Sequence, residues 1–268
     1  MKKNFFPLIA TALGFGIMLY SIFAGADGDM EKFGAFIDVN SFLIVIVGSL
    51  AATAIIYPLS DLKKLPKLWG AMLAEPAVKL EELPPLFESI SQQARKDGIL
   101  SLEAKLEEID DEFIRRGIQM VVDGSEAEEL RQILETELGA LEFRHGQHQA
   151  MVGKWAELAP AFGMIGTVLG LILMLGDLGG DASELGQGMA VALITTLYGS
   201  AFQNLIFAPF ADNLKLKTAN EVFIREVMIE GIIMIQNGTN PRSVYDKLAT
   251  YLSPAQRAAL SETTGKEE

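Results

Sequence analysis

The sequence predicts an all-α membrane protein whose four transmembrane helices form two hairpins, with a helical insert between the hairpins and a helical tail. Half of the 268 residues are hydrophobic and 21% are charged, a mixture typical of a chain that combines membrane spans with water-facing segments. Four apolar stretches each reach the roughly 20 residues needed to cross about 30 Å of hydrocarbon. None of them alternates polar and apolar residues, so helices are favoured over the strands of a barrel.

The first apolar stretch has two readings. Lys2 and Lys3 precede it, and Ala24-Gly25-Ala26 resembles a signal-peptidase site. However, the run is longer than the apolar region of roughly 7–15 residues in a signal peptide, which favours an uncleaved helix. The predicted spans are residues 4–25, 37–57, 155–176 and 188–210. They divide the chain into a first hairpin (1–58), an insert (59–154), a second hairpin (155–210) and a tail (211–268).

Charge predicts the orientation of the spans. The loop between the first two has one base, Lys32, and the loop between the last two has Asp177, Asp181 and Glu184 without any base. All other Lys and Arg residues fall on the N-terminal tip, the insert and the tail. The positive-inside rule therefore places those three segments and both termini in the cytoplasm of a multi-pass protein of the cell (inner) membrane.

The insert is predicted to be helical because its apolar residues recur every three to four positions. The breaks between its helices are expected at Pro84-Pro85, Gly98 and Asp123-Gly124. A tail helix over about 218–235 is expected to end at Asn237-Gly238. The three predicted apolar faces are Leu83, Leu86, Phe87, Ile90 and Ala94; Leu102, Leu106, Ile109 and Phe113; and Leu130, Ile133, Leu134 and Leu141.

Composition and motifs exclude several functions. The net charge of −13 argues against nucleic acid as a partner, and the absence of cysteine removes disulfides and thiolate chemistry. No phosphate-binding loop, zinc-protease motif or nucleophile elbow is present, so an enzyme is not expected. His145 and His148 share a helix face, but solvated histidines are favoured over metal ligands because no third ligand is near in sequence. No cofactor is predicted.

The second hairpin carries the residues of greatest interest. Pro160 stands near the start of the third span, where it frees a carbonyl and can kink the helix. Thr167 lies on the same face, and Thr195 and Thr196 stand in the fourth span. The glycines around them favour close helix packing in lipid. The threonines fit either that role or the replacement of a cation's hydration shell.

Charged groups leave three questions open. Residues 158–176 and 188–210 contain no Asp, Glu, Lys, Arg or His, so an ion path here would need a carboxylate from another polypeptide. Asp38, at the outer end of the second span, either attracts cations at an entrance or marks the membrane interface. Arg95 and Lys96, followed by Glu103, form either a solvated turn or an electrostatic docking site.

Five segments in this order resemble the A subunit of bacterial flagellar stators, the MotA and PomA family within the MotA/TolQ/ExbB superfamily. The matching segments are 36–41 (FIDVNS), 94–103 (ARKDGILSLE), 159–167 (APAFGMIGT), 189–199 (MAVALITTLYG) and 235–242 (IQNGTNPR).

The resemblance implies a homopentamer around a B subunit of the MotB or PomB type, which supplies the intramembrane aspartate. It also implies that cation influx drives flagellar rotation through the rotor's switch ring, a FliG-type partner, with Arg95, Lys96 and Glu103 at that contact. Asp97, where some relatives have glycine, is a departure that places an extra negative charge beside Arg95.

Two further implications concern the spans. Pro160 and Pro209 match prolines that couple ion binding to shape change. Thr167 and Thr196 match the sodium type, so sodium is favoured over the proton. The alternative is an ExbB or TolQ type of proton-driven energiser, which has three spans and is disfavoured by the first hairpin here.

Overall fold

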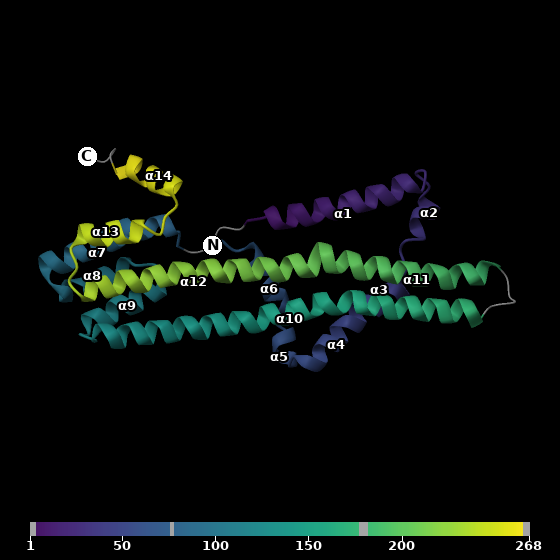
Figure 1. Ribbon diagram of the computed structural model, residues 1–268, viewed down its shortest axis with the longest axis horizontal. Helices are drawn as coiled ribbons and strands as arrows, with labels where there is room; N and C mark the ends of the chain where they lie inside the picture. Colours follow the sequence, from purple (N-terminus) through teal and green to yellow (C-terminus); the bar gives the residue numbers. More distant parts are fainter. Residues whose placement is uncertain (1–3, 76–77, 177–181, 265–268) are drawn as a thin grey trace. The chain divides into compact units, whose positions relative to one another are not determined.

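The computed structural model describes residues 4–75, 78–176 and 182–264, and every regular element among them is helical (Figure 1). Lys2, Lys3, Asp177 and Asp181, which contributed to the predicted orientation, lie outside the described residues. The chain forms two compact units. The core unit comprises Pro76–Arg144 and Lys217–Glu268, and the span unit comprises Lys2–Glu75 and His145–Leu216. The core unit thus joins most of the insert to most of the tail.

The first part of the chain contains one long helix followed by shorter ones. Its elements are α1 (Phe6–Gly25), α2 (Met30–Gly34), α3 (Val39–Phe42), the π-helix η1 (Leu43–Val47), α4 (Gly48–Ile56), α5 (Leu59–Leu62), α6 (Leu65–Leu73), the 3₁₀ turn η2 (Leu80–Glu82), α7 (Leu83–Asp97), the 3₁₀ turn η3 (Ile99–Ser101), α8 (Leu102–Lys105), the 3₁₀ turn η4 (Leu106–Glu108) and α9 (Glu112–Val122).

The second part contains the longest helices. Its elements are α10 (Ala127–Gly176), α11 (Ala182–Phe202), the π-helix η5 (Gln203–Phe207), α12 (Ala208–Gln236), α13 (Pro241–Ala249) and α14 (Pro254–Thr264).

Four helical segments are long and apolar enough to cross a membrane, which confirms the predicted all-α, four-span architecture. The helices that contain the third and fourth spans extend beyond the predicted span residues. The third belongs to α10, a helix of 50 residues that begins at Ala127, and the fourth continues through η5 into α12. Each residue added to a helix contributes one more backbone hydrogen bond. A helix that leaves lipid and enters water therefore continues without a break.

The core unit is held together by large apolar side chains. Phe87 of α7, Leu134 of α10 and Ile232 of α12 are fully buried in one cluster, which Val244 and Leu248 of α13 join. Burial of a side chain of this kind stabilises by about 1.5–3 kcal/mol relative to an exposed position. This shared core explains why the tail folds with the insert.

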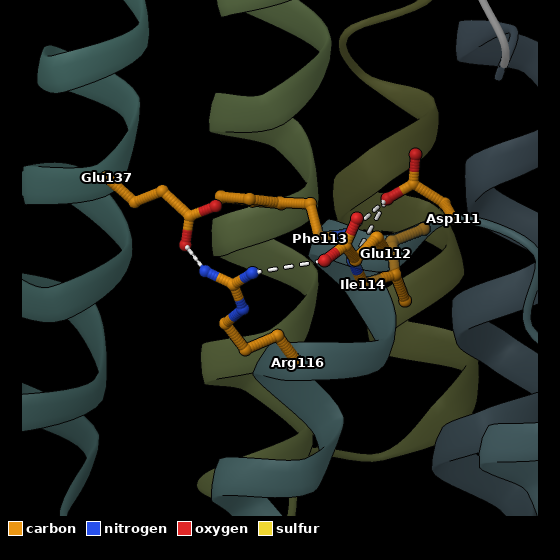
Figure 2. A network of polar contacts seen from close by, with 6 residues as sticks. All are labelled: Asp111, Glu112, Phe113, Ile114, Arg116 and Glu137. Atoms are coloured by element: carbon orange, nitrogen blue, oxygen red, sulfur yellow. Dashed lines mark hydrogen bonds and ion pairs between the residues drawn. The ribbon is translucent and has the colours of Figure 1, made fainter.

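Two details of the predicted faces need correction. The face from Leu102 to Phe113 is buried, but it spans α8, η4 and α9 rather than one helix. Asp111 causes the break, because its carboxylate caps α9 by accepting hydrogen bonds from the backbone N–H groups of Phe113 and Ile114 (Figure 2). On α10, Ile133 is exposed, and Leu138 takes its place in the core.

The predicted helix breaks at glycine are confirmed. Gly98, Gly124 and Gly238 all have φ between +66° and +87°, the left-handed region in which a side chain is strained. Pro84 and Pro85 stand in the first turn of α7, where a missing N–H has no helical partner to lose.

A surface network links α9 to α10 in the core unit (Figure 2). Arg116 Nη1 lies 2.8 Å from Glu137 Oε2, and Arg116 Nη2 lies 3.3 Å from Glu112 Oε1. Because these groups are largely solvated, the network contributes at most about 1 kcal/mol.

Candidate functional site

The second hairpin packs through a glycine seam, defined as Gly163, Gly166 and Gly170 of α10 with Gly188 and Gly199 of α11. A Cβ on Gly170 would lie 2.5 Å from the carbonyl oxygen of Gly188, and one on Gly199 would lie 3.0 Å from that of Ala159. The first distance is shorter than real Cβ contacts and the second is tighter than most of them, so the two backbones pack closely at both glycines. The glycines therefore have the packing role favoured by the sequence.

Beside the seam, Thr167 and Thr196 form a cluster of oxygen atoms. Their Oγ1 atoms are 2.5 Å apart, and each lies 3.1 Å from the carbonyl oxygen of Ala192. Thr167 Oγ1 also lies 3.1 Å from the carbonyl oxygen of Gly163. Each hydroxyl has one hydrogen, so the cluster holds more acceptor positions than protons.

The cluster lies on a face that the chain's own described residues leave uncovered. Thr196 is exposed and Thr167 is half-buried. Around them, Met164, Leu171 and Leu193 have exposed fractions of 67%, 42% and 65%. An apolar face of this kind within predicted spans is suited to lipid or to another helix.

Thr195 lies on a different face of α11 from Thr196. It is fully buried, and its Oγ1 donates to the carbonyl oxygen of Val191 at 2.8 Å or to that of Ala192 at 3.2 Å. A Cβ on Gly166 would lie 2.4 Å from Thr195 Cγ2, so this side chain fills the seam. The sequence grouped the three threonines, and the structure separates the buried Thr195 from Thr167 and Thr196.

The two prolines have unlike surroundings. Pro160 lies inside the uninterrupted helix α10, and its Cα would be 3.0 Å from a Cβ on Gly199. Pro209 follows the π-helix η5. The ring of a proline clashes with the carbonyl of the residue four positions earlier, which here is Leu205. Leu205 lies in η5, and the wider turn of a π-helix leaves room for the ring.

Asp38 acts as the N-cap of α3. Its Oδ2 accepts a hydrogen bond from Ser41 N at 2.6 Å. Its own N–H donates to Tyr198 Oη at 3.2 Å, and Tyr198 Oη donates to the carbonyl oxygen of Phe36 at 2.7 Å. Asp38 thus helps to attach the second span to α11.

Sequence reasoning missed the aromatic residues that join the spans. The Phe202 ring lies about 6 Å from four others, in centroid distances of 5.9–6.2 Å, and these belong to Phe15, Phe42, Tyr198 and Phe207. Trp155 stacks on Phe207 at 4.1 Å and donates to Ser49 Oγ at 3.0 Å. A tyrosine and a phenylalanine one turn apart in the fourth span were the available signal.

In the core unit, Arg95, Lys96 and Glu103 are exposed on either side of the Gly98 turn. Ser101 Oγ donates to the carbonyl oxygen of Gly98 at 2.6 Å, and Gln93 Nε2 donates to that of Ser101 at 3.0 Å. These bonds fix the turn. Within the described part of the chain, none of the three charged side chains forms an ion pair.

The histidines do not form a metal site among the described residues, where no group of three His, Asp or Glu side chains gathers. His148 Nε2 instead lies 3.3 Å from Lys64 Nζ, whose positive charge opposes a bound cation.

The four apolar helical segments define a multi-pass membrane protein, and its second hairpin groups threonine and carbonyl oxygens on a face that the described residues leave uncovered. Comparison with known proteins agrees with that class. Residues 105–227 match the MotA/TolQ/ExbB proton channel family. The "Uncharacterized protein YtxD" of Bacillus subtilis is 40% identical over 254 residues, 94% of this chain and 92% of that protein.

A motility protein and a chain of a flagellar stator complex are also similar to this chain. "Motility protein A" of Borreliella burgdorferi is 38% identical, with coverage of 98% of this chain and 100% of that protein. A chain of the flagellar MotAB stator complex from Bacillus subtilis has a TM-score of 0.81 at 35% identity, with 91% of this chain and 97% of that chain covered.

The chain belongs to the MotA/TolQ/ExbB family and, within it, to the A subunits of flagellar motor stators. This is a family of cation-driven channels and not of enzymes.

Proposed function

We propose that this chain is the A subunit of a sodium-driven flagellar stator in the cell (inner) membrane, with both termini in the cytoplasm. In this proposal residues 155–210 line the ion path, and the insert, residues 59–154, contacts the rotor. The oxygen cluster of Thr167 and Thr196 carries the proposal, because it is an uncovered set of cation ligands between two segments, residues 158–176 and 188–210, that contain no carboxylate.

A B subunit completes the path in this proposal. An ion in a membrane protein is normally accompanied by an ionisable group, and residues 158–176 and 188–210 supply none. The uncovered apolar face beside the cluster fits a helix that brings an aspartate. The related Bacillus subtilis chain belongs to a MotAB complex, which supports a two-chain assembly. Five copies of the A chain around two B helices are expected from the family resemblance.

Sodium is favoured because neutral oxygens replace its hydration shell, whereas a proton requires only a titrating group. Thr167 Oγ1, Thr196 Oγ1 and the Ala192 carbonyl are the proposed ligands, next to the B-subunit aspartate. Thr195 supports them by fixing the seam, since it is buried there. Asp38 stands at the outer end of this path as either an entrance charge or a structural cap.

The ion flux is converted to torque through shape change at Pro160 and Pro209, where the backbone has fewer hydrogen bonds to break. One charge that crosses 100 mV releases about 2.3 kcal/mol. Arg95, Lys96 and Glu103 then act on the rotor's switch ring, a FliG-type partner. Their exposure and their lack of described ion-pair partners support this role.

The sodium proposal is tested in a motile host that lacks its own stator and expresses this chain with its cognate B subunit. Thr167→Ala is expected to shift the sodium concentration for half-maximal swimming speed by about 10–150-fold, equivalent to the loss of one ligand to a charge. Thr11→Ala is the matched control, because among the described residues Thr11 Oγ1 bonds only within α1, to Pro7 O at 2.9 Å. If the swimming speed of the wild type did not depend on the sodium concentration, sodium would be excluded as the driving ion.

The rotor contact has a separate test. Combined Arg95→Glu and Glu103→Lys reversal is expected to lower torque while membrane assembly stays normal. Reversal of Arg116 and Glu137, an ion pair on the same unit, is the control. Equal torque in the two double variants would exclude docking through residues 95–103.

A further inference from the structure

The amphipathic helix α6 lies beside the ends of the predicted third and fourth spans. Its Trp69 ring stacks on Phe210, the last residue of the predicted fourth span, with centroids 4.2 Å apart. Met72 is buried in the same cluster as Val152, three residues before the predicted third span. α6 also follows the second span by a few residues, since α4 ends at Ile56. These contacts place α6 at the level where the spans leave the hydrocarbon.

Packing of the apolar face of α6 directs its other face outward. Leu65, Leu68 and Leu73 lie against the cluster, whereas Lys63, Lys64 and Lys67 are exposed. Lys63 and Lys67 are four residues apart across backbone in the right-handed helical region, so they project from one side. Residues 62–74 contain no acid, although the whole chain has a net charge of −13.

Lys63 and Lys67 differ from other lysines of the span unit in their ion pairs. Lys154 and Lys215 each lie 2.9 Å from the carboxylate of a neighbouring acid, Glu157 and Asp212. Lys64 is held by Asp61 at 2.8 Å. Lys63 and Lys67 form no ion pair with the described residues and are available to a partner outside the chain.

We infer that Lys63 and Lys67 bind the headgroup of an anionic phospholipid in the adjacent leaflet. An anionic headgroup fits because it combines negative charge with the depth at which α6 lies, and a tryptophan in the same helix is typical of that interface. The site anchors the end of the second span against the second hairpin, and it does not depend on which ion drives the motor.

Native mass spectrometry of the full-length protein in detergent tests the site. The protein is titrated with equal amounts of phosphatidylglycerol and phosphatidylcholine that carry the same acyl chains. Phosphatidylglycerol is expected to be retained at least about fivefold more, the factor contributed by one lysine near an anionic surface. The double substitution Lys63→Gln and Lys67→Gln is expected to bring the ratio of retained phosphatidylglycerol to phosphatidylcholine close to one. The control, Lys154→Gln with Lys215→Gln, removes equal charge and is expected to leave this ratio high.

An equal effect of the two double variants would overturn the site, because the preference would then follow net charge alone. So would equal retention of the two lipids by the wild type. Circular dichroism checks that the variants are folded. If the Lys63 and Lys67 variant does not fold, wild-type protein in about 1 M ammonium acetate decides the question, since the screening length falls to about 3 Å there. A preference that survives this salt would exclude a headgroup held by exposed lysines.

Discussion

The core unit and the second hairpin of the span unit differ in what lies against the glycines where their helices meet. The core unit has close glycine contacts at Gly117 and Gly231, but there the glycine receives a side chain, from Ile232 and Phe87 respectively. In the span unit, Gly170 and Gly188 face each other's backbones, and no side chain separates α10 from α11 at that point. The same residue type thus makes room for a large apolar group at Gly117 and Gly231 and for a second helix at Gly170 and Gly188.

The difference follows from the surroundings predicted for the two units. In water, each Å² of apolar surface removed contributes about 25 cal/mol, which rewards large buried side chains. In lipid that reward is absent, so helices associate through close backbone contact and hydrogen bonds. A hairpin held by backbone contact keeps its threonine hydroxyls within reach of carbonyls on the neighbouring helix, as Thr167 and Ala192 show.

The largest effect is expected from a cavity in the core unit. Phe87→Ala removes a fully buried ring and is expected to destabilise the core unit by about 3–5 kcal/mol. Hydrogen exchange of the amides of α7 and the C-terminal half of α12 measures this loss. Leu100→Ala, at a residue that is 74% exposed, is the control and is expected to change protection little. Similar exchange in both variants would show that the core does not depend on side-chain burial.

The seam is tested by the smallest possible addition. Gly170→Ala places a methyl group 2.5 Å from a backbone oxygen and is expected to cost about 1–3 kcal/mol through separation of α10 and α11. Gly153→Ala on the same helix meets nothing within 4 Å and is expected to stabilise by up to about 1 kcal/mol. Thermal denaturation of the purified protein in detergent compares them. The two substitutions are expected to shift the melting temperature in opposite directions. A shift in the same direction would contradict the distinction between the two packing modes.

A local capping bond in the core unit should contribute less than either packing mode. Asp111→Ala is expected to cost about 1 kcal/mol, because two N–H groups at the start of α9 lose their acceptor. Asp111→Asn keeps an acceptor oxygen and is expected to retain most of that stability. Denaturant unfolding of both variants provides the measurement, and an equal loss would assign the effect to charge instead of capping.

The smallest effect concerns pH in the span unit. The hydrogen bond from Lys64 holds the pKa of Asp61 below its ordinary value of 3.8, although burial opposes this shift. Because the folded state then binds its proton less readily than the unfolded state, the stabilisation is present above pH 3.8 and is lost as the pH falls through the folded pKa. The difference in stability between the wild type and Asp61→Asn is therefore expected to narrow in acid. A constant difference would show that the contact does not depend on ionisation.

Individual residues show how far the sequence could predict this structure. The glycines at 98, 124 and 238 end helices as expected, since positive φ is a local property of the backbone. Ile133 fits an apolar helical face in the sequence, yet it is exposed, because several registers of α10 satisfy the same periodicity. Thr195 and Thr196 are adjacent in sequence, and only the position of α10 decides that one is buried in the seam and the other is exposed.

The sequence alone determined the number of spans, the helical insert and the lack of a carboxylate in residues 158–176 and 188–210. These features depend on the length, periodicity and charge of single segments, which the cost of unpaired polar groups in lipid makes decisive. Only the tertiary structure decided that insert and tail share one core and that Thr167, Thr196 and the Ala192 carbonyl meet. Contacts of this kind join residues far apart in the chain, and they depend on which surfaces fit together after the helices have formed.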